Sequence, residues 1–284
     1  MSSILTSKGL LHYEVQGQGK PVILLHGWMG SWRLWHSTIQ TLSKNYRTYA
    51  VDFWGFGDSW TTGAHTVTDF VEMVHDFMNQ LGIEKAPVIG HSMGGTVTLM
   101  LAVHYPNCVE KVGVIGSPLQ GSSLSIQLKL IGQLPVAWLA HRYPWIFRIS
   151  TYFYTPVSNH QQAWRDMALR DFQNTTLQSF CESIQSLKNT DISQAIQKIQ
   201  QPVIAFYGKK DNVVSPQQAD VLRKALPKAY IVEYPTIRHF PMLEIPEHFM
   251  GILKDFLAGN TTQNFYSPSV EGNQRPMSPV EIER

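Results

Sequence analysis

The 284-residue sequence predicts an α/β protein with a mostly parallel central sheet, flanking helices and one helical insertion. Three observations lead to this prediction. Short apolar runs, typical of strands buried on both faces, alternate with helix-like segments of about a dozen residues. Several of these runs lead directly into loops rich in glycine and polar residues. The alternation stops once, between about Gln120 and Asp191, and then resumes.

The first half of the chain contains most of the expected strands and helices. Asp69 and Gly82 are typical start and stop signals for a helix, and Pro106 would end another one. Strands are expected at residues 9–15, 21–25, 47–51, 86–90 and 109–115, and helices at residues 35–42, 68–81 and 96–105. Functional loops of such parallel sheets gather at the carboxyl ends of the strands.

The segment 120–191 breaks the pattern because it is helix-like, aromatic and without a clear strand. Strand patterns return at residues 203–208 and 231–234, and a last helix is expected at about 247–257. We therefore expect one core domain, residues 1–119 and 192–258, interrupted by a helical cap or lid at 120–191. The tail, residues 259–284, is rich in Asn, Gln, Ser and Pro, which predicts disorder or loose attachment to the surface.

Composition argues against several classes of function. The net charge is only +2, and the chain has neither a basic run nor a zinc-type Cys/His spacing, so no nucleic-acid partner is expected. Cys108 and Cys181 alone give no disulfide framework. Residues 1–8 are polar, and no apolar run approaches the roughly 20 residues that span a bilayer. These features predict a cytoplasmic protein of undetermined oligomeric state.

The most informative motif is Gly90-His91-Ser92-Met93-Gly94, which lies between an expected strand and an expected helix. This is the context of a G-x-S-x-G nucleophile turn. Ser92 needs a strained backbone to project its hydroxyl group, and Gly90 and Gly94 provide the room. Amides at the start of the helix would face the developing negative charge of an acyl transfer. The motif alone is equally compatible with a buried turn that carries a capping serine.

Two further residues follow strands at the same edge of the sheet. Asp211 comes just after the strand 203–208, and His239 follows the strand 231–234. Taken singly, Asp211 is also a common turn residue, and His239 is also compatible with a surface loop. However, a serine nucleophile needs a base and a carboxylate that orients the base. The chain order Ser92, Asp211, His239 supplies all three.

Together these motifs resemble the α/β-hydrolase fold with a cap domain, over about residues 9–258. The matching pieces are His26-Gly27-Trp28, Asp52-x-x-Gly55-x-Gly57-x-Ser59, Gly90-His91-Ser92-Met93-Gly94-Gly95, Asp211 and His239. The resemblance implies that Ser92 is the nucleophile, His239 the general base and then acid, and Asp211 the orienting carboxylate. It also implies an oxyanion hole made by the backbone amides of Trp28 and Met93.

Other polar residues near the motifs are expected to be structural. His26 would hold the oxyanion loop, and His91 would point away from Ser92 and pack. Asp52 and Asp58 would support the turn of their strand-end loop. No metal is expected because the histidines lack ligand spacing, and no cofactor is expected because no glycine-rich loop continues into a phosphate-binding pattern.

The serine at position 92 favours hydrolysis of a carboxylic ester, as in esterases and lipases. Family members that open epoxides or remove halide use aspartate at this position, so those reactions are not expected. Carbon–carbon bond hydrolysis and perhydrolysis remain alternatives within the same family. A receptor or scaffold that binds a ligand without turnover is the alternative from another class.

The insertion gives the only indication of the substrate. Residues 111–165 contain no Asp or Glu but five cationic residues and many aromatic ones. Such a lid would suit an apolar, lipid-like acyl group and could touch an anionic membrane surface. The aromatic residues are equally compatible with packing of the lid onto the sheet. Trp145, Phe147 and Phe240 are the expected residues of the substrate pocket.

Overall fold

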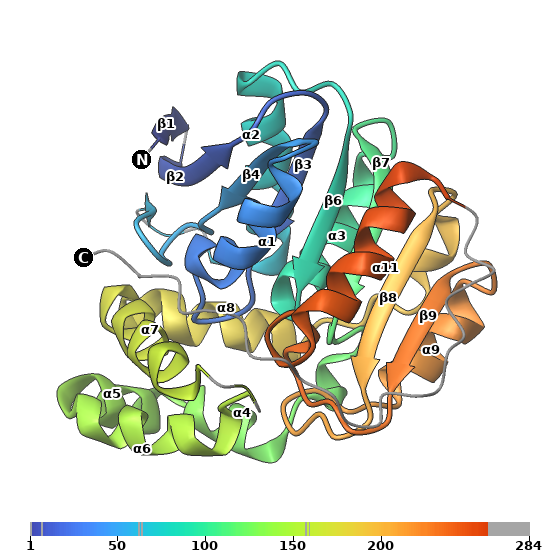
Figure 1. Cartoon of the computed structure of the whole chain (residues 1–284). Helices are drawn as coiled ribbons and strands as arrows, with labels where there is room; N and C mark the ends of the chain where they lie inside the picture. The colour runs from blue at the N-terminus through green and yellow to red at the C-terminus, as the bar shows by residue number, and fades with distance from the viewer. Residues whose placement is uncertain are drawn as a thin grey trace.

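The computed structural model describes residues 2–6, 8–61, 63, 65–156, 158 and 160–260. Its centre is a nine-stranded sheet with the order β1-β2-β4-β3-β6-β7-β8-β9, in which β5 pairs with β2 (Figure 1). The strands are β1 Ser2–Thr6, β2 Gly9–Gln16, β3 Pro21–Leu25, β4 Arg47–Val51, β5 Trp60–Thr61, β6 Ala86–His91, β7 Val109–Ile115, β8 Val203–Gly208 and β9 Tyr230–Tyr234. β4, β3 and β6 to β9 run parallel, whereas β1, β2 and β5 pair antiparallel.

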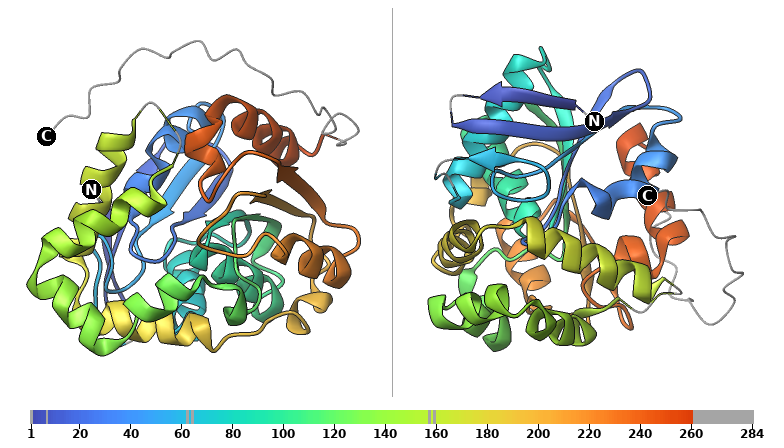
Figure 2. Two further views of the ribbon diagram at one scale, coloured as in Figure 1. Left: turned by 90° about the horizontal axis from the view of Figure 1, so that it is seen from below. Right: turned by 90° about the vertical axis from the view of Figure 1, so that its left-hand side faces the viewer.

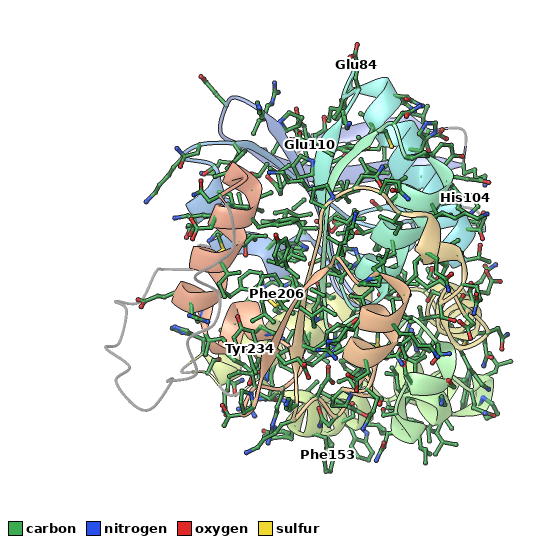
Figure 3. All side chains as sticks on the ribbon, turned by 90° about the vertical axis from the view of Figure 1, so that its right-hand side faces the viewer. Glu84, His104, Glu110, Phe153, Phe206 and Tyr234 are labelled. Carbon is green, nitrogen blue, oxygen red and sulfur yellow. The ribbon has the colours of Figure 1, made fainter. Side chains whose placement is uncertain are left out.

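Helices cover both faces of the sheet. α1 His36–Leu42 and α11 Pro246–Ala258 share one hydrophobic core with the sheet. Phe206 of β8, labelled in Figure 3, belongs to this core, and its ring lies 4.8 Å from that of Phe249. A second core, on the other face, includes residues of α2 Val67–Gln80, α3 Met93–His104 and α9 Gln218–Ala225. Because both faces are covered, all six residues of β6 and of β8 are buried.

In the described residues, five α-helices lie between β7 and β8. They are α4 Ile126–Ile131, α5 Leu134–Arg142, α6 Pro144–Tyr154, α7 Gln161–Asn174 and α8 Leu177–Lys188. They gather below the sheet at one end of the molecule (Figures 1 and 2). An isolated antiparallel bridge joins Gln120 to Asp191, so the chain leaves and re-enters the core at adjacent positions. β7 and β8 pair directly in parallel, and the segments before and after these helices thus form one sheet.

The predicted α/β class and mostly parallel sheet are confirmed. The strands at 21–25, 47–51 and 109–115 have the expected limits. Sequence reasoning missed β1, which is largely polar and only partly buried at the edge of the sheet, and β5, which has only two residues. The expected disordered tail lies, from residue 261 onward, outside the described residues. Among the helices of the described residues, none is both long and apolar enough to cross a bilayer.

Candidate active site

Ser92 lies in a tight turn between β6 and α3. Its backbone has φ 52° and ψ −120°, an uncommon conformation for a residue with a side chain. A Cβ atom on Gly90 would lie 2.2 Å from the carbonyl oxygen of Gly94, and one on Gly94 would lie 2.4 Å from the carbonyl oxygens of Leu25 and His26. The two glycines of the motif are therefore required by close backbone approach.

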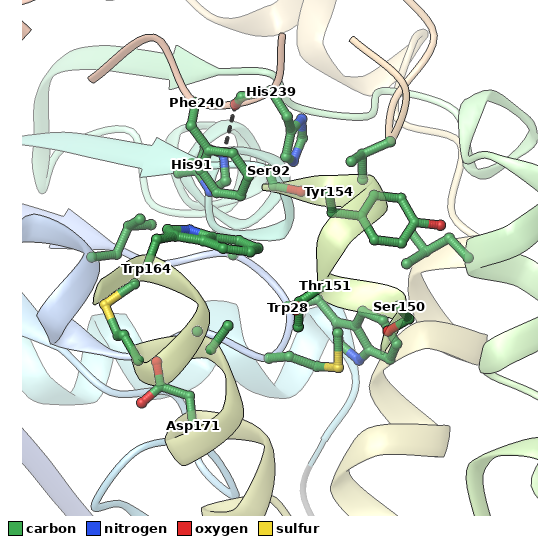
Figure 4. A pocket seen from close by; sticks show the side chains of 18 of the residues that line it. Trp28, His91, Ser92, Ser150, Thr151, Tyr154, Trp164, Asp171, His239 and Phe240 are labelled. Atoms are coloured by element: carbon green, nitrogen blue, oxygen red, sulfur yellow. Dashed lines mark hydrogen bonds between the residues drawn. The ribbon is translucent and has the colours of Figure 1, made fainter. Parts of the chain in front are cut away.

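Asp211 and His239 meet at the same edge of the sheet. Nδ1 of His239 lies 2.7 Å from Oδ2 of Asp211, and both side chains are almost fully buried. The other oxygen, Oδ1, accepts hydrogen bonds from the amides of Val213 and Val214 at 2.8 and 3.0 Å. These bonds fix the carboxylate, which in turn fixes the imidazole. Figure 4 shows this imidazole beside Ser92 in the wall of one cavity.

The loop after β3 carries Trp28, and its neighbour Gly27 approaches Ser92 so closely that a Cβ atom on Gly27 would lie 3.1 Å from Cβ of Ser92. Within the described residues, the amides of Trp28 and Met93 take no part in the backbone hydrogen bonds of turns and loops. Met29 has φ 58° and is, with Ser92, one of the two non-glycine residues at positive φ among the described residues. Both residues with this uncommon backbone conformation line the cavity.

His26 holds this loop, as the sequence predicts. Its Nε2 accepts a hydrogen bond from the amide of Phe53 at 3.0 Å, and its Nδ1 lies 2.7 Å from the carbonyl oxygen of Gly27. Burial lowers the pKa of His26 below its usual value, which favours the neutral ring. A neutral ring with its proton on Nδ1 satisfies both bonds at once.

His91 also has a structural partner. Its Nε2 lies 3.0 Å from the carbonyl oxygen of His239, and its ring stacks on Phe240 at 4.8 Å (Figure 4). Burial, and then the nearby His239, lower the pKa of His91 well below its usual value. The neutral ring therefore donates its Nε2 proton and supports the backbone of His239. Its edge still reaches the cavity wall.

The cavity has a volume of about 110 Å³ and a largely apolar wall. Phe147 and Phe240 lie in this wall, together with Trp28 and Trp164. The structure does not bring Trp145 to the cavity, because its side chain is 61% exposed on the outer side of α6. Residues two positions apart on a helix point in nearly opposite directions, so Trp145 and Phe147 cannot share one side.

Asp171 of α7 is a cavity residue that sequence reasoning missed. Its carboxyl group is buried, and its Oδ2 accepts a hydrogen bond from Ser31 at 3.0 Å. Oδ1 has no hydrogen-bond partner among the described residues and lies 3.9 Å from Nη1 of Arg33. Burial raises the pKa of Asp171 to about 7. Helical spacing was the available signal, since Trp164, Met167, Ala168 and Asp171 follow the pattern i, i+3, i+4, i+7 and all line the cavity.

The buried carboxylate in the loop after β4 already has hydrogen-bond partners within the protein. Ligand atoms of His12, Asp52 and Asp58 lie within 4.8 Å of one another, a spacing that a metal could bridge. However, Oδ1 of Asp52 accepts from the amide of Trp32 at 2.6 Å. Oδ2 accepts from the amide of Asp58 at 3.0 Å and lies 2.9 Å from Nδ1 of His12. These contacts assign Asp52 to the support of the turn.

Comparison with known proteins gives a consistent result. Residues 20–246 match the family profile described as the alpha/beta hydrolase fold. A pimeloyl-[acyl-carrier protein] methyl ester esterase of Nitrosomonas europaea is 23% identical over 258 residues, 85% of this chain and 97% of that protein. Two solved structures share the fold. An esterase of Thermogutta terrifontis has a TM-score of 0.80 at 19% identity and covers 92% of this chain and 100% of its own. An enol-lactonase of Burkholderia xenovorans LB400 has a TM-score of 0.80 at 20% identity, with coverage of 90% and 100%.

Proposed function

Since this chain belongs to the α/β-hydrolase fold family, we propose that it is a serine hydrolase that cleaves carboxylic esters through an acyl-enzyme. The main support is the 2.7 Å contact between His239 and Asp211, because His239 lies together with Ser92 in the wall of the cavity. A receptor without turnover would need neither this pair nor the strained backbone of Ser92.

In the proposed reaction, Oγ of Ser92 attacks the ester carbonyl carbon while Nε2 of His239 removes the hydroxyl proton. Asp211 accepts the hydrogen bond from Nδ1–H and stabilises the imidazolium. The amides of Trp28 and Met93 would donate to the oxyanion of the tetrahedral intermediate. His239 then protonates the departing alcohol. Water, activated by the same imidazole, hydrolyses the acyl-enzyme and regenerates Ser92.

The cavity supports a small to medium apolar acyl group. Its volume of about 110 Å³ is similar to that of an apolar cavity that holds a benzene-sized molecule. We propose that α4–α8, within residues 120–191, act as the cap expected from the sequence. Phe147 and Trp164 contribute to the wall from these helices, whereas Phe240 contributes from the core. The names of the esterase and lactonase relatives are consistent with ester hydrolysis.

A series of p-nitrophenyl esters, from acetate to palmitate, tests this proposal with wild type and Ser92→Ala side by side. We expect hydrolysis by the wild type, with an optimum among the shorter chains, and loss of activity in Ser92→Ala. A fluorophosphonate probe should label the wild type and spare the variant. If both proteins are equally inactive and unlabelled, the esterase proposal is wrong.

A further inference from the structure

An exposed apolar surface covers the helices at the end of the molecule. Eleven of the fifteen exposed large hydrophobic side chains of the described residues lie between positions 126 and 153. They are Ile126, Leu130, Leu134, Val136, Trp138, Leu139, Tyr143, Trp145, Ile149, Tyr152 and Phe153. Figure 3 shows Phe153 at the end of the molecule opposite Glu84. We call the surface formed by these eleven side chains, on α4, α5, α6 and the single residue between α5 and α6, the outer face.

The exposed residues of α6 follow helical spacing. On α6, Trp145, Ile149, Tyr152 and Phe153 are at positions i, i+4, i+7 and i+8, which form one side of a helix. Phe147 of the same helix is buried and stacks on Phe172 at 4.0 Å. α6 is therefore apolar on two sides, and among the described residues only its inner side is covered by the rest of the protein. Packing of α6 onto the rest of the protein explains why its inner side is apolar, but it does not explain why its outer side is apolar.

The charge of this region has one sign. Residues 111–165 contain no Asp or Glu, whereas Arg142 and Arg148 are exposed between the aromatic side chains. Arg142 lies over the ring of Tyr143 at 5.3 Å, and Arg165 lies over that of Tyr152 at 4.4 Å. Aromatic rings beside cationic groups are typical of protein segments that bind at the membrane interface, between the lipid headgroups and the acyl chains.

We propose that the outer face docks the protein on an anionic phospholipid bilayer. The apolar side chains would enter the headgroup region, and the arginines would contact lipid phosphates. A bilayer fits better than an acidic protein partner because exposed apolar side chains far outnumber exposed cations on these helices. α6 would then contact the lipid with one side and line the cavity with the other, through Phe147, Ser150 and Tyr154.

Vesicle sedimentation tests the proposal. Phosphatidylcholine vesicles with about a third phosphatidylglycerol are compared with pure phosphatidylcholine, at low and at physiological salt. The wild type should sediment with the anionic vesicles, and less so at the higher salt. The double variant Trp145→Ser/Phe153→Ser should lose roughly tenfold or more in partitioning. Arg142→Gln and Arg148→Gln should each lose about fivefold at low salt.

Two controls separate docking from other effects. Trp60→Ser removes a tryptophan that is 59% exposed on β5, outside the outer face, and should bind as the wild type does. Ser92→Ala should bind normally, since docking does not depend on the proposed chemistry. The proposal is overturned if the wild type stays in solution with anionic vesicles at both salts, or if Trp60→Ser loses as much binding as the double variant. Self-association that the double variant abolishes, without vesicle binding, would assign the face to a second copy of the chain.

Discussion

Nδ1 of His239 lies 2.7 Å from Oδ2 of Asp211, although 28 positions separate the two residues in the chain. The carboxylate is itself fixed by two amides of its own loop, those of Val213 and Val214. A fixed acceptor on Nδ1 keeps the proton there and leaves Nε2 free to accept one. The proposed chemistry at Ser92 depends on this tautomer.

Asp211→Asn should therefore lower kcat by roughly 10³–10⁴ with little change in KM. The asparagine carbonyl would keep the two amide bonds, so its NH₂ group would face His239 and favour the proton on Nε2. Steady-state kinetics with a p-nitrophenyl ester measure the effect. Asp220→Asn, an exposed aspartate of α9, is the matched control. A loss of less than about tenfold in Asp211→Asn would contradict the proposed role of Asp211.

His26→Ala should reduce kcat by about 10² while Ser92, His239 and Asp211 remain in place. The substitution leaves the amide of Phe53 and the carbonyl group of Gly27 without their buried partner, and the loop that carries the Trp28 amide can shift. Kinetic constants for one short ester are compared with those of His36→Ala, which removes an exposed histidine of α1. Equal kcat values in both variants would show that the loop does not need His26.

Gly90→Ala should destabilise the protein by about 3 kcal/mol or more and abolish probe labelling of Ser92. The new Cβ would lie 2.2 Å from the carbonyl oxygen of Gly94, so the turn would have to move. Gly251→Ala is the control, because its Cβ would meet no atom within 4 Å on α11. This second variant should gain about 0.5–1 kcal/mol. Urea unfolding measures both, and a neutral Gly90→Ala would refute the packing argument.

The raised pKa of Asp171 predicts that the stability of the folded protein depends on pH. Burial raises the pKa of Asp171 to about 7. The hydrogen bond from Ser31 and the charge of Arg33 lower this pKa, whereas the charges of Asp52 and Asp58 raise it further. Above its ordinary pKa near 4 the unfolded chain loses this proton, while the folded chain keeps it until about pH 7. Stability should therefore fall as pH rises from about 4 to 7, by about 2–4 kcal/mol.

Asp171→Asn should remove this dependence, because the amide keeps the acceptor for Ser31 and does not ionise. The variant should match the wild type below about pH 4 and exceed it increasingly up to about pH 7 and above, in urea or thermal unfolding. Asp166→Asn changes an exposed aspartate of the same helix and should leave the pH profile unaltered. If the pH profile of Asp171→Asn is the same as that of the wild type, the folded protein does not hold a proton on Asp171 up to about pH 7.

The sequence by itself determined the parallel strands of the sheet and the loops at their carboxyl ends that carry the candidate residues. Buried parallel strands are short apolar runs, which local composition reveals, and the loops after them carry Ser92, Asp211 and His239. The tertiary structure alone decided which residues of α4 to α8 face the cavity. An aromatic residue such as Trp145 or Phe147 is compatible with a core or with a surface until the helix is oriented. The same holds for Asp171, whose place in the cavity depends on contacts with Ser31 and Arg33, 140 and 138 positions earlier in the chain.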